Sequence, residues 1–180
     1  DIVLLCGTFL CLQLYDDYPQ LLAELQQRGF ITAVDTGWPP QGWSDEVRAQ
    51  IARWLPQCDW LLLNEVETLG LSGADDLHTG AHHLAQRLSG RGGCVVKCGA
   101  QGVGCWQRQH SLQQPARAVA VVDTIGAGDS FNAGFLTALL HQQDLATALQ
   151  WGIAVASLAI STQPRRYPDW QQLQLCAQEF

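Results

Sequence analysis

The residues best suited to chemistry lie in one short segment, Asp123-Thr-Ile-Gly-Ala-Gly-Asp-Ser-Phe131. An apolar run over 118–122 predicts a buried strand before it, and the spacing of apolar residues over Ser130 to Leu140 predicts a helix after it. A glycine-rich turn between a strand and a helix offers free backbone N–H groups and the positive end of a helix dipole. Asp129 stands at the expected start of that helix.

The pairing of such a turn with a carboxylate indicates a particular chemistry. The turn favours an anion, and the carboxylate beside it is well placed to take a proton from a hydroxyl group that attacks phosphate. A charge-stabilising cradle and a base that orients the nucleophile are together typical of phosphoryl transfer. The structural alternative is that Asp129 only caps its helix and that the glycines only form the turn.

The whole run from Asp123 to Phe135, DTIGAGDSFNAGF, closely resembles the second signature of the ribokinase-like (PfkB) family of carbohydrate kinases. In that family the Gly-Ala-Gly-Asp turn forms the anion hole for the transferred phosphoryl group, and its Asp is the catalytic base. The resemblance therefore implies that backbone N–H groups from Ile125 to Gly128 hold the phosphoryl oxygens. It implies the following site residues: Gly126, Ala127 and Gly128 in the hole, Asp129 as the base, and Thr124 at the nucleotide.

Short apolar runs alternate with amphipathic segments along most of the chain. The expected strands cover Ile2 to Cys6, Phe30 to Asp35, Asp59 to Asn64 and Gly93 to Gly99, with a strand pair at a sheet edge between 103 and 122. The expected helices cover Tyr18 to Gln27, a segment starting at Ser44, Ala74 to Ser89, Ser130 to Leu140, Leu145 to Ser161 and Asp169 to Glu179. This alternation predicts an α/β fold with a mainly parallel sheet covered on both faces, and the resemblance makes it a three-layer α/β/α fold of the ribokinase-like type.

Two oxygen-bearing side chains, Asn64 and Glu67, follow the expected strand that ends at Asn64. Their spacing resembles an Asn-x-x-Glu motif that the family ties to its magnesium–phosphate region. A hard cation held through water by an amide and a carboxylate suits Mg²⁺. The alternative is an acidic helix N-terminus that the helix dipole favours.

A third strand end carries Lys97-Cys-Gly-Ala-Gln-Gly102, which resembles the family segment Lys-x-Gly-x-x-Gly that lies against the nucleotide. Gly99 and Gly102 would then let the backbone approach the phosphates or the ribose, and Lys97 would add charge near the triphosphate. The alternative is that the glycines serve the turn and that Lys97 only ends its strand. At the end of another strand, Asp35 matches a family segment, but the Asn and Arg that often follow it are absent here.

The segment from Ala148 to Ser161 is rich in small residues. In the resembling family this helix lies beside the adenine, which implies a nucleotide contact at Ala156, although close helix packing requires the same residues. The family normally has a Gly shortly after this helix, whereas this chain has Thr162-Gln-Pro-Arg-Arg166. That departure weighs against a K⁺ site near Asp123 and Ile125, so K⁺ is a weaker candidate cofactor than ATP and Mg²⁺.

The composition limits the partners and the location. A net charge of −7 and the lack of a basic run argue against a nucleic-acid partner. No apolar stretch is long enough to span a membrane. The seven cysteines form no Cys-x-x-Cys pair and lie mostly in apolar runs, which favours reduced, buried thiols and a cytoplasmic location.

The resemblance predicts an ATP-dependent sugar kinase, fructokinase-like or 2-dehydro-3-deoxygluconokinase-like, that transfers the γ-phosphoryl group to a carbohydrate hydroxyl. A nucleoside or vitamin kinase of the same fold, and a nucleotide-binding fragment without catalysis, are the alternatives. The resemblance covers only the later part of a family member. We therefore expect residues 1–180 to form one nucleotide-binding, catalytic domain of a longer kinase, without the N-terminal part and its lid, and the full-length protein to be compatible with a homodimer.

Overall fold

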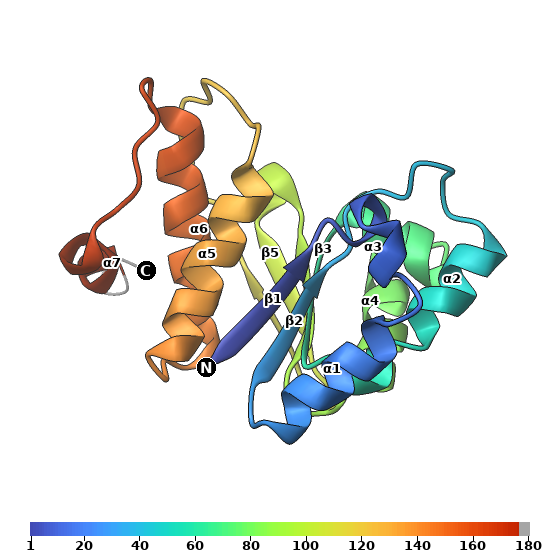
Figure 1. Ribbon diagram of the computed structural model, residues 1–180. Coiled ribbons are helices and arrows are strands. Elements are labelled where there is room, and N and C mark those ends of the chain that lie inside the picture. Colours follow the sequence, from blue (N-terminus) through green and yellow to red (C-terminus); the bar gives the residue numbers. More distant parts are fainter. Residues whose placement is uncertain (177–180) are drawn as a thin grey trace. The chain divides into compact units, whose positions relative to one another are not determined.

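The computed structural model describes residues 1–176, apart from the side chains of Leu12 and Cys176, and Figure 1 shows its ribbon. The strands are β1 (Ile2–Cys6), β2 (Ile31–Asp35), β3 (Trp60–Asn64), β4 (Gly93–Lys97), β5 (Val103–Trp106) and β6 (Ser111–Gln114). The α-helices are α1 (Tyr18–Gln27), α2 (Asp45–Ala52), α3 (Glu65–Ser72), α4 (Leu77–Arg87), α5 (Ala127–Leu140), α6 (Leu145–Ser161) and α7 (Trp170–Cys176). Short 3₁₀ helices cover Thr8–Leu10, Leu12–Leu14, Leu55–Gln57 and Gly99–Gln101.

The strands form one sheet in the order β1-β2-β3-β4-β5-β6. By contacts along the chain, however, the protein divides into two compact units. The first unit holds Asp1–Lys97 and Gly104–Ser111, and the second holds Cys98–Val103 and the chain from Leu112 onward. The expectation of a single domain over 1–180 stays a prediction.

The core of the first unit is a set of parallel strands. Each of the pairs β1–β2, β2–β3 and β3–β4 is parallel, and Asn64 is opposite Lys97 in the last pair. The central residues of β3 and β4 have no exposed surface: Leu61, Leu62, Leu63, Cys94, Val95 and Val96. Continuous apolar strands of this kind are typical of a parallel sheet that is covered on both faces.

Helices α2 and α4 of the first unit begin where a polar side chain caps them. The Oγ of Ser44 accepts a hydrogen bond from the backbone of Val47 at the start of α2 (3.3 Å). An Asp76 oxygen accepts one from the backbone of Thr79 at the start of α4 (2.9 Å). Each cap satisfies a backbone N–H that the first turn of a helix leaves without a partner. Helix α1 contacts β2, and α4 contacts both α3 and β4.

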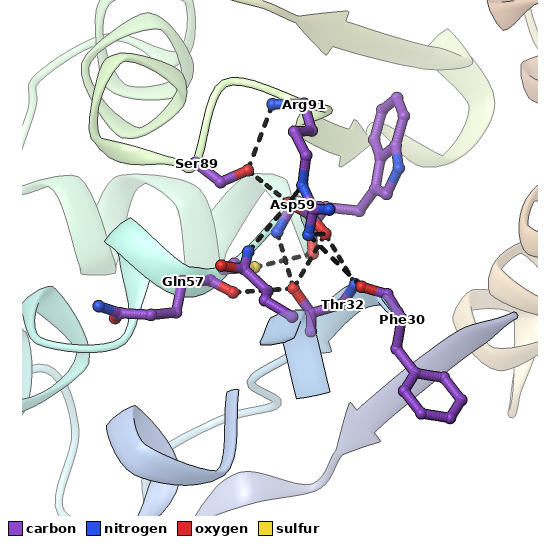
Figure 2. A network of polar contacts seen from close by, with 9 residues as sticks. Phe30, Thr32, Gln57, Asp59, Ser89 and Arg91 are labelled. Carbon is purple, nitrogen blue, oxygen red and sulfur yellow. Dashed lines mark hydrogen bonds and ion pairs between the residues drawn. The ribbon is translucent and has the colours of Figure 1, made fainter. Parts of the chain in front are cut away.

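A buried polar network joins the amino ends of the parallel strands (Figure 2). Its centre is Asp59, whose carboxylate accepts hydrogen bonds from the backbone of Thr32 (2.9 Å), from Ser89 Oγ and from the guanidinium of Arg91 (2.7 and 2.9 Å). Thr32 Oγ1 also donates to the backbone oxygen of Gln57 (2.8 Å). The network therefore ties β2, the start of β3 and the turn before β4 together.

The expected strand pair is present as β5 and β6. Strands β4 and β5 are neighbours joined by only five residues, which is too short for a parallel crossover, so the two strands form a hairpin. A second tight turn joins β5 to β6, where the backbone N–H of Gln107 donates to the carbonyl oxygen of His110 (2.8 Å).

In the second unit, α5 and α6 lie side by side (Figure 1). Glycines make this close packing possible. A Cβ atom on Gly134 would lie 2.6 Å from the carbonyl oxygen of Trp151, and one on Gly152 would lie 2.5 Å from the ring of Phe131. Helix α7 packs against α6. Close helix packing thus explains part of the small-residue content of 148–161.

The structure corrects several expected boundaries. Residues 118–122 do not form a strand, and Val119, Val121 and Val122 are exposed rather than buried. The backbone of this segment instead follows the end of α6, because the N–H groups of Val122 and Asp123 both donate to the carbonyl oxygen of Ile160 (2.8 and 3.2 Å). The short helix α3 was expected only as the alternative interpretation of Asn64 and Glu67, and α4 is shorter than the predicted 74–89.

Two further findings concern the remaining expectations. Helix α7 agrees with the predicted terminal helix as far as Cys176, and residues 177–180 lie outside the described part. Among the described cysteines, Cys58, Cys94 and Cys105 are buried, whereas Cys6 and Cys11 are exposed. Burial raises the pKa of the Cys105 thiol to about 12. None of the helices formed by residues 1–176 combines the length and the apolar character that a membrane crossing requires.

Candidate functional site

The glycine turn of the second unit begins α5. Gly126 precedes the helix with φ 70° and ψ 13°, a left-handed conformation that glycine adopts without strain. The N–H of Ala127 donates to the carbonyl oxygen of Thr124 (3.1 Å), and the N–H of Ser130 donates to the carbonyl oxygen of Gly126 (2.9 Å). The helix therefore starts three residues earlier than the expected Ser130, and the whole Ala-Gly-Asp sequence lies in its first turn.

Asp129 is the third residue of α5, and its side chain is exposed. The residue that caps the helix is Gly126, and no side chain makes a capping hydrogen bond there. The alternative in which Asp129 serves only as the helix cap is therefore wrong. A Cβ atom on Gly126 would lie 3.9 Å from Asp129 Oδ2, so the carboxylate borders the glycine of the turn. An exposed carboxylate in this position can accept a proton from a bound hydroxyl group.

Only part of the expected anion hole is open. Of the four N–H groups from Ile125 to Gly128, that of Ile125 donates to Asp123 Oδ1 (3.0 Å) and that of Ala127 to the backbone of Thr124. The N–H groups of Gly126 and Gly128 have no acceptor among the described residues. Two amides and the positive end of the helix dipole thus remain for an anion.

Arg165 is a site residue that sequence reasoning did not identify. Its Nη2 lies 2.8 Å from Asp123 Oδ2, and its Nη1 would lie 3.2 Å from a Cβ atom on Gly126. The only signal in the sequence was that Arg165 and Arg166 are its only adjacent basic pair. The ion pair places a guanidinium group at the edge of the glycine turn.

A pocket of about 360 Å³ lies in the second unit. One face of α6 lines it with Ala154, Ser157, Leu158 and Ser161. The other lining residues are Arg117, Val119, Pro168, Gln172 and Leu175. At 3.6 residues per turn, Ala156 lies on the opposite side of α6 from this face, and it is not part of the lining. The pocket has the size and the mixed lining of a small-molecule site.

Gly99 and Gly102 shape the connection between β4 and β5. Both have positive φ values, 51° and 102°, and the N–H of Cys98 donates to the carbonyl oxygen of Gly102 (2.8 Å). A Cβ atom on Gly102 would overlap the carbonyl oxygen of Gln114, so backbone packing alone requires this glycine. Gly99 is exposed, and a Cβ atom there would meet nothing within 4 Å. Gly99 is therefore open on the side where a side chain would stand, whereas that side of Gly102 is filled by the chain itself.

In the first unit, Asn64 and Glu67 form a reciprocal cap at the start of α3. Asn64 Oδ1 accepts from the backbone of Glu67 (2.8 Å), and Glu67 Oε2 accepts from the backbone of Asn64 (2.9 Å). The helix-start alternative therefore describes the local structure correctly. Each side chain keeps further oxygen or nitrogen atoms beyond this cap. Among the described residues, no group of three or more His, Cys, Asp or Glu side chains is arranged to hold a metal ion.

Lys97 lies at the end of β4 and forms an ion pair with Asp35, which ends β2 (Nζ–Oδ2 2.9 Å). Both side chains are mostly buried. Burial raises the pKa of the nearby Glu67 carboxyl, the negative charge of Asp35 raises it further, and hydrogen bonds with Asn64 and the charge of Lys97 oppose that rise. Because carboxyl ends of parallel strands share one edge, these four polar residues gather at that edge of the first unit.

The chain was compared with known proteins by sequence and by structure. It is 32% identical over 110 residues to 1-phosphofructokinase from Haloferax volcanii, which covers 61% of this chain and 33% of that protein. It is 30% identical over 173 residues to 2-dehydro-3-deoxygluconokinase from Haemophilus influenzae, which covers 89% of this chain and 53% of that protein. The chain thus spans about a third to a half of the length of these two relatives.

The fold is similar to that of aminoimidazole riboside kinase from Salmonella enterica, with a TM-score of 0.77 and 23% sequence identity. That match covers 99% of this chain and 62% of the other. It confirms the expected three-layer α/β/α class with a mainly parallel sheet. The sequence also matches the pfkB family of carbohydrate kinases over residues 1–171. By this match the chain belongs to the pfkB carbohydrate kinase family.

Proposed function

We propose that the protein transfers the γ-phosphoryl group of ATP to a hydroxyl group of a carbohydrate, with Asp129 as the general base. The observation that carries this proposal is the first turn of α5, where the exposed Asp129 carboxylate borders Gly126 and where two backbone amides of the same turn lack acceptors among the described residues. In the reaction, Asp129 takes the hydroxyl proton, and the oxygen forms a bond to the γ-phosphorus. The bond from phosphorus to the β–γ bridging oxygen then breaks, and ADP leaves with that electron pair.

The amides of Gly126 and Gly128 are proposed to hold the equatorial oxygens of the transferring phosphoryl group. Negative charge spreads over these oxygens in the transition state, so fixed N–H groups and the helix dipole stabilise it without reorganisation. Ala127 belongs to the same hole by position. Its N–H closes the turn on Thr124 and therefore keeps the two glycine amides in place.

The nucleotide is proposed to occupy the α6 pocket with its base. The apolar and small side chains of Ala154, Ser157 and Leu158 suit a flat aromatic ring. The remaining proposed nucleotide contacts are those that the family resemblance implies, at Lys97, Gly99, Gly102, Thr124 and Ala156. Of these, Ala156 has the weakest support, because it lies on the other side of α6 from the pocket face.

A magnesium ion fits the donor atoms of the first unit. Asn64 and Glu67 offer hard oxygen atoms, and the cap uses only one carboxylate oxygen of Glu67. Mg²⁺ usually keeps several waters and takes one or two protein ligands, so two side chains suffice. We propose that Asn64 and Glu67 hold Mg²⁺ through water, as the family resemblance implies.

A monovalent cation fits poorly at Asp123. The two carboxylate oxygens there are already engaged, one by Arg165 and the other by the Ile125 amide. K⁺ therefore has no part in the proposed reaction. The free, buried thiols of Cys58, Cys94 and Cys105 support a reducing, cytoplasmic location for the protein.

The proposal is tested with the full-length protein that contains this chain. ATP consumption is measured against sugars, sugar acids and nucleosides, with and without Mg²⁺, for the natural protein, Asp129→Asn and the matched control Asp75→Asn. Asp75 is exposed and makes no hydrogen bond or ion pair with the described residues. The proposal expects Mg²⁺-dependent turnover on a sugar or sugar acid that only Asp129→Asn loses. Turnover confined to a nucleoside would show that the acceptor is a nucleoside and not a sugar or sugar acid. ATP binding without turnover on any acceptor would overturn the kinase function.

A further inference from the structure

We infer that Arg165 is a positioning residue of the glycine turn and supplies a permanent positive charge beside it. The inference rests on the proposed phosphoryl transfer at that turn. It adds a residue that no part of the DTIGAGD segment contains, since Arg165 follows α6, about forty positions further along the chain.

Arg165 is connected to the glycine turn through two hydrogen bonds to the Asp123 carboxylate. Its Nη2 binds Asp123 Oδ2 (2.8 Å), and the other oxygen of the same carboxylate accepts the N–H of Ile125 (3.0 Å). One carboxylate therefore connects the guanidinium to the backbone just before Gly126. A displaced guanidinium would release the Asp123 side chain and with it the Ile125 amide.

The Arg165 guanidinium also lies directly beside Gly126. A Cβ atom on this residue would lie 3.2 Å from Arg165 Nη1 and 3.9 Å from Asp129 Oδ2. The guanidinium and the proposed base thus border the same glycine. An arginine is protonated at every relevant pH, so its charge adds to the helix dipole in stabilising the negative charge that builds on the phosphoryl oxygens in the transition state.

Backbone hydrogen bonds also hold the segments that carry Asp123 and Arg165 close together. The N–H groups of Val122 and Asp123 both donate to the carbonyl oxygen of Ile160, at the end of α6 (2.8 and 3.2 Å). Only four residues separate Ile160 from Arg165. The segment that leads into the turn and the segment that carries Arg165 are therefore anchored at one point.

The ion pair between Arg165 and Asp123 is partly exposed to water, which favours a role in the reaction over a role in the stability of the fold. The side chains of Arg165 and Asp123 are 28% and 46% exposed. Ion pairs that are this accessible to water contribute little to the stability of a protein. Loss of Arg165 should therefore affect the geometry of the turn and the turnover number far more than the folding of the chain.

The test compares Arg165→Ala, Arg165→Lys and the control Arg166→Ala in the full-length protein. Arg166 is the exposed neighbour, and among the described residues only its backbone N–H makes a hydrogen bond, to Thr162 Oγ1. We expect kcat to fall about tenfold to a hundredfold in Arg165→Ala, with the KM for ATP and the melting temperature nearly unchanged. Arg165→Lys should recover part of kcat, and added methylguanidinium should partly rescue Arg165→Ala. A kcat for Arg165→Ala within twofold of the natural protein would overturn the inference.

A second measurement holds whether or not the protein is a kinase. Hydrogen exchange of the Ile125 and Ala127 amides, which are hydrogen-bonded within the turn, should be at least about fivefold faster in Arg165→Ala than in Arg166→Ala, because the turn loses its anchor. If the exchange rates agree, Arg165 does not position the turn, even if the kinase is active. If exchange is faster but the natural protein phosphorylates no acceptor, the positioning role stands and the proposed function fails.

Discussion

The Arg91 guanidinium forms a bidentate interaction with the Asp59 carboxylate, with Nε 2.9 Å from Oδ1 and Nη2 2.7 Å from Oδ2 (Figure 2). The Asp59 side chain is 1% exposed, whereas half of the Arg91 side chain remains accessible. A buried carboxylate is stable only when its oxygens are fully hydrogen-bonded, and here Thr32, Ser89 and Gln26 complete the set. The pair lies at the amino end of β3, and Asn64 lies at the carboxyl end of the same strand.

Removing Arg91 should therefore destabilise the protein strongly. The change Arg91→Ala leaves a buried negative charge without its cation, which typically costs about 3–5 kcal/mol in free energy of unfolding. Urea denaturation measures this loss. The matched control is Arg48→Ala, which breaks a pair with the 96% exposed Asp45 and one bond to the backbone of Gly70. That variant should lose about 1–2 kcal/mol. Equal losses in the two variants would contradict the special role of the Asp59 network.

Gly126→Ala should impair turnover more than stability. The residue has φ 70°, and its new methyl group would press on Arg165 Nη1 at 3.2 Å. The left-handed conformation costs an alanine about 1–2 kcal/mol. Gly29→Ala is the control, because Gly29 has φ 85° and open space around it. Both variants should lose similar stability in thermal unfolding, but only Gly126→Ala should lose about tenfold or more in kcat. Turnover that is reduced equally in both would argue against a site at the turn.

The buried carboxyl of Glu67 should make stability depend on pH. Burial raises its pKa above the ordinary value of 4.5 in the folded protein. The folded state then holds this proton more tightly than the unfolded state, so this contribution to stability is present below pH 4.5 and is lost as the pH rises through the folded pKa. Glu67→Gln keeps an oxygen for the Asn64 amide but cannot ionise.

The stability of Glu67→Gln relative to the natural protein should therefore increase from pH 4 to pH 8, as measured by urea denaturation. Glu65→Gln, two residues before Glu67 in the same turn and without a part in the cap, should show no such trend. In the full-length protein, Glu67→Gln should also raise the Mg²⁺ concentration needed for half-maximal activity by about tenfold. A flat pH dependence would mean that Glu67 is not held in a buried site.

The α6 pocket predicts which helix face contacts the nucleotide. Ser157 lines the pocket, whereas Ala156 lies on the other side of the helix. Ser157→Leu should fill part of the 360 Å³ volume and raise the KM for ATP by about tenfold, with a smaller effect on kcat. Ala156→Leu is the comparison, and its KM for ATP should stay within about threefold. A larger rise of the KM for ATP in Ala156→Leu than in Ser157→Leu would place the adenine base on the Ala156 side of α6.

Much of the fold could be predicted because local signals agreed with the final structure. The bounds of α1 and α6 follow from apolar spacing together with a preceding cap or turn, and Ser44 does cap α2. The run 118–122 misled because an apolar composition does not decide whether a sheet partner exists. Its backbone instead bonds to the end of α6. Secondary-structure propensity depends on residues that are close in the sequence, so it does not predict a hydrogen bond to Ile160, almost forty residues away.

The site was predictable where a motif is continuous and was not where the contact spans a long separation. Asp129 and the glycines belong to one segment, so their grouping at the start of α5 was foreseeable, although the helix was expected to begin only at Ser130. The pairing of Asp123 with Arg165, 42 residues away, depends on how α6 ends, and no spacing rule predicts it. Similarly, the small residues of 148–161 indicated a tightly packed helix, but only the structure separates the pocket face from the face of Ala156.

The most direct test of the account is the effect of Asp129→Asn on the two stages of the reaction in the full-length protein. The variant has the same size and keeps the turn, but it cannot accept a proton. The account predicts that kcat with the preferred acceptor falls by a factor of about 100 or more, while the dissociation constant for ATP changes by less than about threefold. A variant that retains more than about a tenth of the natural turnover would contradict the role of Asp129 as the base.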